Sequence, residues 1–144
     1  MTHFERLGLP GRFDLDPADL ERAYLAASRA VHPDHHAGGA DATAAVNAAF
    51  QTLRDPLRRA EYLLGLRGGS AASVQDPAFL METMDLRERA EAGEADAVGR
   101  ELDARLGGLY AELARQFAAD DLPAAGRTLA MVKTLRSLRR EVGD

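Results

Sequence analysis

The densest group of chemically versatile side chains is one short segment, His32-Pro33-Asp34-His35-His36, which holds three of the four histidines. Imidazole and carboxylate groups form hydrogen bonds, bind metal ions and exchange protons. Three interpretations of the segment are open. It is a polar helix stop, in which Pro33 ends a helix and Asp34 makes a local turn bond. Alternatively, it is a metal site or a docking loop for another protein.

The metal interpretation has four candidate ligands, His32, Asp34, His35 and His36. Ligands that adjoin in one loop rarely converge on a single ion without help from elsewhere, and the one remaining histidine is His3. A hydrolytic His–Asp pair is disfavoured because Pro33 separates the two residues and no serine lies in a nucleophile-elbow pattern. The chain has no cysteine, which excludes disulfides, thiolate metal sites and a thiol nucleophile. We expect no cofactor.

The composition predicts an all-α protein. The 144 residues include 28 Ala and 20 Leu, but 6 Val and no Ile, so good helix formers dominate. A net charge of -5 argues against a general nucleic-acid binder. No apolar run is long enough to span a membrane, and the N-terminus lacks the pattern of a signal peptide. These features favour the cytoplasm.

Asp-Pro pairs predict three helix starts, at Asp16-Pro17, Asp55-Pro56 and Asp76-Pro77, because Asp caps orphan N–H groups and Pro is tolerated in the first turn. The spacing of apolar residues predicts a short helical turn at Phe4 and Leu7. It also predicts six helices, over 17–31, 41–53, 55–67, 77–91, 96–118 and 122–142. The Gly68-Gly69-Ser70 break predicts a linker over 70–75. We therefore expect domains over 1–69 and 76–144, the second an antiparallel three-helix bundle.

The helix predicted over 77–91 carries two apolar stripes. Phe79, Leu86 and Ala90 form one, and the other contains Leu80, Met81 and Met84, followed by Asp85 and Glu88. A helix in a small bundle needs one stripe for its core. Methionine suits an adaptable interface, and carboxylates around apolar side chains form a polar rim. Periodicity alone leaves the second stripe open between core packing, interdomain packing and a partner surface.

Charge is unevenly distributed in the second half of the chain. Residues 76–103 hold nine acidic and three basic side chains, whereas residues 127–140 hold five basic ones and no acid. Ion pairing inside the bundle, together with cations late in a helix, explains this pattern. A partner-facing acidic surface is the alternative, and the two explanations are compatible.

The His-Pro-Asp segment directly follows an amphipathic helix and precedes a loop and a second helix, an arrangement that resembles the J-domain signature of DnaJ-type co-chaperones. Four segments narrow the resemblance to the HscB family, the J-domain co-chaperones of iron–sulfur cluster assembly. They are Phe4–Pro10, Asn47–Leu64, Phe79–Glu82 and Leu86–Glu88. The resemblance covers residues 4 to about 91 by motif and the remainder by helix count.

This resemblance implies an L-shaped, two-domain protein without catalysis of its own. Its J-domain is expected to dock on an HscA or DnaK-type chaperone and to stimulate ATP hydrolysis through His32, Pro33 and Asp34. Arg29 and Arg22 would supply cations, Arg29 being the better placed. The C-terminal domain is expected to bind an IscU-like scaffold protein; the resemblance assigns this contact to Leu80, Met81, Met84, Asp85 and Glu88.

Two positions depart from the family pattern. His35 stands where a lysine commonly follows the tripeptide, and Ala92 stands where relatives often continue the acidic edge. Two other functions remain as alternatives. One is a general J-domain co-chaperone that binds unfolded clients through the methionine face, and the other is a metal-binding protein that uses the histidine loop. Neither a nucleic acid nor a membrane is expected as a partner.

Overall fold

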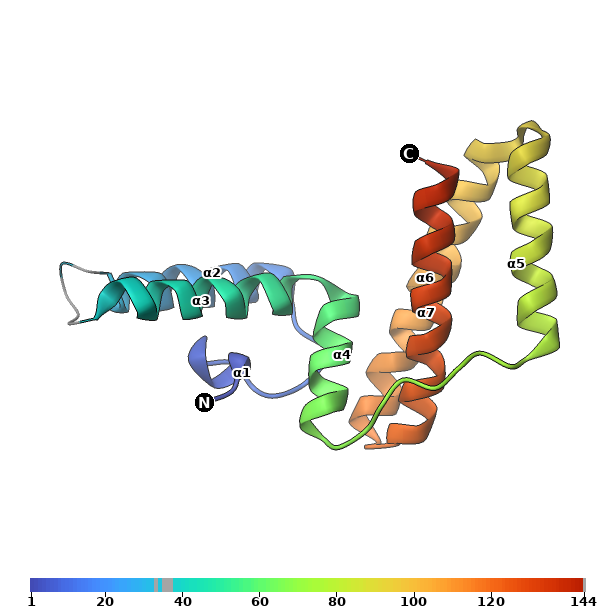
Figure 1. Ribbon diagram of the computed structural model, residues 1–144. Helices are drawn as coiled ribbons and strands as arrows, with labels where there is room; N and C mark the ends of the chain where they lie inside the picture. Colours follow the sequence, from blue (N-terminus) through green and yellow to red (C-terminus); the bar gives the residue numbers. More distant parts are fainter. Residues whose placement is uncertain (33, 35–37, 144) are drawn as a thin grey trace. The chain divides into compact units, whose positions relative to one another are not determined.

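The computed structural model describes residues 1–32, 34 and 38–143, and this part of the chain contains helices and no strand. Two compact units divide the chain, Met1–Leu63 and Leu64–Asp144. Among the residues described, no helix is long and apolar enough to cross a membrane. The elements in chain order are α1 (His3–Arg6), α2 (Pro17–Ala30), α3 (Gly39–Arg54), α4 (Pro56–Leu66), α5 (Pro77–Arg89), the π-helical turn η1 (Ala90–Glu94), α6 (Ala95–Ala118) and α7 (Leu122–Val142) (Figure 1).

All three predicted Asp-Pro helix starts are confirmed by their cap bonds. The backbone N–H of Ala18 donates to Asp16 Oδ1 at 2.8 Å, and that of Ala78 donates to Asp76 Oδ1 at 3.0 Å. At the start of α4, Leu57 N–H donates to the side chain of Asp55 at 3.2 Å. Each cap satisfies an N–H group that has no partner inside its helix. Each of these helix starts is therefore determined by a capping side chain and a backbone N–H group only two positions away in the sequence.

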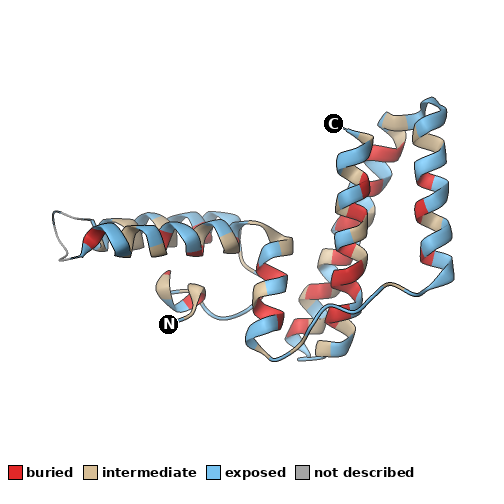
Figure 2. Cartoon of the chain, in the orientation of Figure 1, coloured by how far each residue is buried: buried red, intermediate tan, exposed pale blue. Residues whose placement is uncertain are grey.

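The N-terminal unit is built on the α2–α3 hairpin, which α1 and the start of α4 close at one end (Figure 1). The ring of Tyr24 on α2 stacks on Phe50 of α3 with 4.1 Å between centroids, and its hydroxyl donates to Asn47 Oδ1 at 2.7 Å. Helix α3 begins at Gly39, two residues before the predicted start at Asp41. The fully or nearly buried apolar side chains of this unit are Phe4, Leu7, Phe13, Leu20, Val46, Ala49, Leu53, Ala60 and Leu63 (Figure 2).

The C-terminal unit has α6 and α7 as its main packed pair, with α5 laid against both (Figure 1). Buried side chains repeat along α6 and α7 at helical spacing, among them Val98, Leu102, Leu109, Leu113, Leu129, Val132 and Leu135. The predicted break between α5 and α6 is present at η1, where two helices meet at a kink. Gly93 makes the reversal with a φ of 105°, a conformation that disfavours any side chain.

Residues 70–76, which we call the strap, are non-helical and are anchored on the C-terminal unit. Ala72 N–H donates to the carbonyl of Gly126 on α7 at 3.2 Å. Just before the strap, the Arg67 guanidinium donates to the carbonyl of Phe117 at 2.7 Å, at the end of α6. The predicted 70–75 linker is therefore a segment held against α7. The boundary between the two units falls earlier, within α4.

The strap approaches α7 closely at Gly126, because a Cβ added there would overlap the backbone oxygen of Ser70. We expect Gly126→Ala to lower the free energy of unfolding by about 1–3 kcal/mol, the usual cost of overpacking. Gly108→Ala is the matched control, because it lies on α6 in open space. This control should raise stability by about 0.5–1 kcal/mol, since Ala is the better helix former. Urea unfolding of both variants checks the prediction, which is wrong if Gly126→Ala also stabilises.

Candidate functional site

The first candidate site lies where α2 ends. Helix α2 stops at Ala30, and Val31 N–H closes the last turn by donating to the carbonyl of Ala27. The hydroxyl of Thr43 on α3 donates to the carbonyl of Val31 at 3.5 Å, which ties the end of α2 to the start of its partner helix. His32 follows immediately. Pro33, His35 and His36, which the sequence analysis also used, lie outside the described residues.

His32 and Asp34 adjoin in space. Asp34 N–H donates to His32 Nδ1 at 3.2 Å, and Asp34 Oδ2 lies 3.5 Å from the same nitrogen. Because Nδ1 accepts this bond, the neutral ring carries its proton on Nε2. Both side chains are exposed. The pair therefore presents one N–H donor and one carboxylate in a fixed local relation, which suits recognition of another protein's polar and cationic groups.

One face of α2 leads to this pair. Arg22, Leu25 and Arg29 follow one another at spacings of three and four residues, so they share a face, and His32 comes two residues after the helix ends. The guanidinium of Arg22 is paired with Asp19 on the same helix, whereas Arg29 has no ion-pair partner among the described residues. Leu25 is 46% exposed. The sequence analysis missed Leu25, although its spacing from Arg22 and Arg29 could have indicated it.

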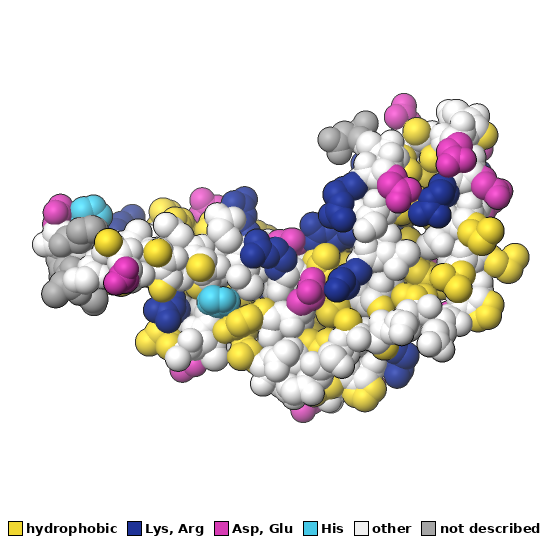
Figure 3. Space-filling model, in the orientation of Figure 1, with side chains coloured by type: hydrophobic (Ala, Val, Ile, Leu, Met, Phe, Trp, Pro, Cys, Tyr) yellow, Lys and Arg dark blue, Asp and Glu magenta, His cyan; other side chains and the backbone are white. Residues whose placement is uncertain are grey.

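The second candidate site is the outer face of α5, defined as Leu80, Met81, Met84, Asp85 and Glu88. The inner face of the helix is buried and consists of Phe79, Thr83 and Leu86. By the 3.6-residue period, Met81, Met84, Asp85 and Glu88 lie on the far side of the helix from these three, and Leu80 lies at one edge of that side. Leu80 is 44% exposed, Met81 70% and Met84 58%. Figure 3 shows hydrophobic side chains gathered on α5 and acidic side chains toward the C-terminal end of that helix.

The core of α5 differs from its prediction in two residues. Thr83, polar and therefore left out of the predicted stripe, is buried, and its hydroxyl donates to the carbonyl of Leu80 at 2.8 Å. That bond satisfies the hydroxyl inside the helix, so Thr83 packs as a small core residue. Ala90, predicted to continue the stripe, is half-buried because η1 begins there and turns the chain away.

Ion pairs secure both edges of α5. Toward α6, Arg105 Nε donates to Glu82 Oε1 at 3.0 Å, and toward α7, Arg87 Nε donates to Glu141 Oε2 at 3.2 Å. A third pair joins α6 to α7, with Arg139 Nε 2.9 Å from Asp103 Oδ1. The predicted charge complementarity inside the bundle is therefore present. The outer face of α5 lies between the Glu82–Arg105 pair at one edge of the helix and the Arg87–Glu141 pair at the other.

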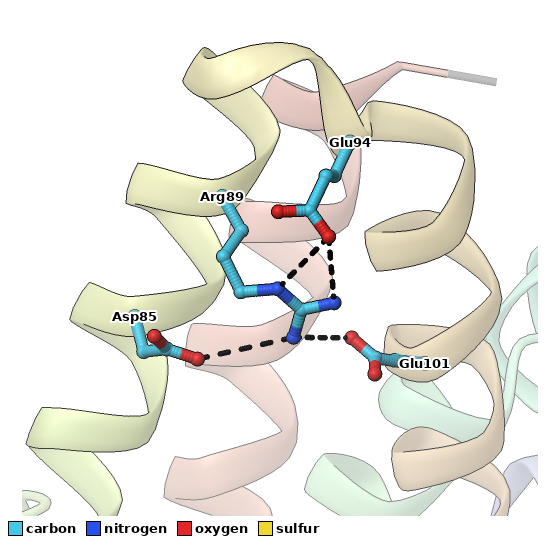
Figure 4. A network of polar contacts seen from close by, with 4 residues as sticks. All are labelled: Asp85, Arg89, Glu94 and Glu101. Atoms are coloured by element: carbon cyan, nitrogen blue, oxygen red, sulfur yellow. Dashed lines mark hydrogen bonds and ion pairs between the residues drawn. The ribbon is translucent and has the colours of Figure 1, made fainter.

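Arg89 is the centre of an acidic network (Figure 4). Its Nη1 lies 2.8 Å from Glu101 Oε2 and 3.8 Å from Asp85 Oδ2, and its Nε lies 3.5 Å from Glu94 Oε1. The hydrogen bond with Glu101 raises the pKa of the Arg89 guanidinium above its ordinary value. The network joins α5, η1 and α6 at one point. Sequence reasoning missed it because its members come from three elements.

The network distinguishes the two carboxylates of the outer face. Arg89 pairs with three acidic side chains, and its distance to Asp85 is the longest of the three. Glu88 makes no ion pair within the described part of the chain and is exposed. Ala92 lies in η1 and is also exposed, so the acidic edge has no charge at that position. Glu88 is consequently the most available anion of the face.

Comparison with named proteins shows which family the chain belongs to. An HscB homolog from Burkholderia thailandensis, named as a co-chaperone protein, is 48% identical over 118 residues, which cover 73% of this chain and 67% of that protein. The chain belongs to the HscB co-chaperone family. Within it, residues 75–143 match the model described as the HSCB C-terminal oligomerisation domain.

Two solved HscB structures share the fold. Chaperone HscB from Vibrio cholerae superposes with a TM-score of 0.82 at 36% identity, covering 99% of this chain and 95% of that chain. The human co-chaperone HscB gives a TM-score of 0.85 at 25% identity, covering 99% and 80% of the two chains. The predicted all-α fold, with a J-domain and a C-terminal helical bundle, is thus confirmed.

HscB membership supports a co-chaperone role in iron–sulfur cluster assembly. The relatives are named as co-chaperones rather than enzymes, which is compatible with the expected lack of catalysis. Among the described residues, no group of three or more His, Asp or Glu side chains is placed to hold a metal. His3, the histidine outside the loop, stacks on Tyr62 with 4.4 Å between ring centroids, and burial lowers its pKa.

Proposed function

We propose that this chain couples an IscU-like iron–sulfur scaffold protein to an HscA or DnaK-type ATPase chaperone in the cytoplasm. The N-terminal J-domain stimulates ATP hydrolysis by the chaperone. The C-terminal domain holds the scaffold and delivers it. The observation that carries the proposal is the outer face of α5, where three large apolar side chains stay exposed on a helix whose other face is buried.

The chaperone binds the end of α2 and the segment after it. His32, Pro33 and Asp34 form the trigger, and Arg29 with Arg22 supplies positive charge on the same helix face. Arg29, which has no ion-pair partner among the residues that the structure describes, attracts an acidic partner more strongly than Arg22, whose charge Asp19 already offsets. Leu25 adds an apolar contact between the two arginines. This surface therefore fits an acidic groove with an apolar floor.

The scaffold binds the outer face of α5. Leu80, Met81 and Met84 provide an apolar centre, and flexible methionines adapt to a partner's shape. Asp85 and Glu88 provide an acidic rim that favours a cationic side chain on the scaffold. Because α5 is tied to α6 and α7 by ion pairs, it presents this face without first having to fold.

Reconstitution tests the proposal directly. The chain is mixed with the DnaK-type or HscA ATPase and the cluster-free IscU-type scaffold of the same organism, and steady-state ATP hydrolysis is measured. We expect the chain to raise the rate, and the chain with scaffold to raise it further than the two separate effects combined. An excess of an unfolded client should not displace the scaffold. Displacement would instead favour a general co-chaperone for unfolded clients, and no stimulation by any mixture would contradict the proposal.

A further inference from the structure

The two carboxylates of the outer face lie on different stripes of α5. Met81, Met84 and Glu88 follow one another at spacings of three and four residues, so Glu88 shares a stripe with the two exposed methionines. By the 3.6-residue period, Asp85 is displaced from Glu88 by about 60° around the helix axis. Glu88 therefore lies beside the apolar side chains of the face, whereas Asp85 lies toward one of its edges.

The stripe of Asp85 faces α6. Glu82, Asp85 and Arg89 follow one another at spacings of three and four residues, and all three line a cleft between α5 and α6. Glu82 pairs with Arg105 of α6 at 3.0 Å. Arg89 pairs with Glu101 of α6 at 2.8 Å. Asp85 is thus placed between two side chains that already bind α6.

The guanidinium of Arg89 is the cation that Asp85 meets. Its Nη1 lies 3.8 Å from Asp85 Oδ2, and Figure 4 shows the guanidinium between α5 and α6 with the Asp85 carboxylate turned toward it. The bond to Glu101 holds the guanidinium in this place. The side chain of Arg89 is only 30% exposed, so solvent screens its charge less than that of a fully exposed arginine. Glu88, by contrast, makes no ion pair with any residue that the structure describes.

We propose that Arg89 is a specificity-determining residue, which offsets the charge of Asp85 and leaves Glu88 as the anion that meets the scaffold. This inference rests on the proposed function, because it takes the scaffold as the occupant of the outer face. A cationic side chain of the scaffold is drawn to Glu88, beside the methionines, and Arg89 repels it from the edge that faces α6. The face therefore selects a scaffold whose cation adjoins its apolar contact, and it fixes one position for that cation.

A double-mutant cycle tests this assignment, with titration calorimetry of the cluster-free IscU-type scaffold at low salt. In the otherwise unchanged chain, Glu88→Gln should weaken binding about tenfold, and Asp85→Asn less than about twofold. In an Arg89→Gln background, Asp85→Asn should weaken binding about fivefold, because the released carboxylate then attracts the scaffold's cation. Arg89→Gln alone should tighten binding about threefold. All these differences should shrink at about 0.5 M salt, where charges are screened.

Two further variants separate the charge of Arg89 from its packing. Arg100→Gln is the matched control, because it removes the same charge from an exposed arginine of α6 that does not line the cleft. It should change scaffold affinity less than about twofold and leave the effect of Asp85→Asn small. Arg89→Lys keeps a cation beside Asp85 and should likewise leave that effect small. Circular dichroism checks that each variant is folded. The comparison of Asp85→Asn with Glu88→Gln in the unchanged chain remains decisive if Arg89→Gln does not fold.

Three results would overturn the inference while leaving the proposed function intact. Equal losses of affinity for Asp85→Asn and Glu88→Gln would show that Arg89 does not distinguish the two acids. A small effect of Asp85→Asn in the Arg89→Gln background would show the same. Weaker binding by folded Arg89→Gln would show that Arg89 only clamps α5 to α6, since a clamp and a charge offset change the affinity in opposite directions. Failure of the unchanged chain to bind the scaffold would instead contradict the proposed function itself.

Discussion

A His32→Gln variant is expected to lose stimulation of the chaperone ATPase while keeping its affinity for the scaffold. Gln retains polar character, but its amide does not reproduce the imidazole whose Nδ1 accepts from Asp34 N–H. Without that bond the carboxylate of Asp34 is no longer held beside the ring, and the two groups cannot act together. The lost charge-assisted contact is worth about 1.5–3 kcal/mol, so stimulation should fall about tenfold or more.

The measurement is the steady-state ATPase rate of the chaperone over a range of concentrations of the variant. His3→Gln is the matched control, because His3 lies in α1, where it packs on Tyr62 of α4, and is not in the segment after α2. This control should stimulate normally at temperatures where it stays folded. If His32→Gln stimulates as well as the wild type, the J-domain trigger assigned to this segment is wrong. Loss of scaffold binding in the same variant would also contradict the separation of the two sites.

The double variant Leu80→Ala with Met81→Ala is expected to weaken scaffold binding by about 2 kcal/mol, or roughly 30-fold. Leu80 and Met81 are exposed at 44% and 70%, so their truncation creates no cavity in the bundle. The unfolding free energy should therefore stay within about 0.5 kcal/mol of the wild type. A large loss of affinity at unchanged stability is the signature of interface anchors.

Titration of the cluster-free scaffold against the double variant gives the affinity, and urea unfolding gives the stability. Leu25→Ala is the matched control, since Leu25 is exposed to a similar extent but lies on α2. It should bind the scaffold normally and stimulate the ATPase less. An unchanged affinity in the double variant would remove the outer face of α5 from the scaffold contact, whatever the behaviour of Leu25→Ala.

Short-range sequence predicted much of the fold. The Asp-Pro starts of α2, α4 and α5 were correct because a cap bond joins residues only two positions apart. The buried stripes of α6 and α7 followed from the 3.6-residue period. The start of α3 and the kinked turn η1 were less accurate, because Gly38 and Gly93 permit several conformations and neighbouring structure selects one.

The candidate sites were predicted in part. The spacing of Leu80, Met81 and Met84 placed them on one stripe, but it could not say whether that stripe was buried. Packing of Phe79, Thr83 and Leu86 on the rest of the bundle decided the question, leaving the other stripe exposed. Leu25 on α2 was missed because a single leucine in a helix is normally assigned to the core.

By itself, the sequence determined where helices begin, which side chains share a helix face, and the family signature around His32 and Asp34. These properties depend on residues a few positions apart, so local geometry is enough to specify them. The tertiary structure alone decided which face of α5 is exposed, that Arg89 joins α5 to Glu101, and that the strap is held against α7. Each of these arises from contacts between elements distant in sequence, and only the packed core brings such elements together.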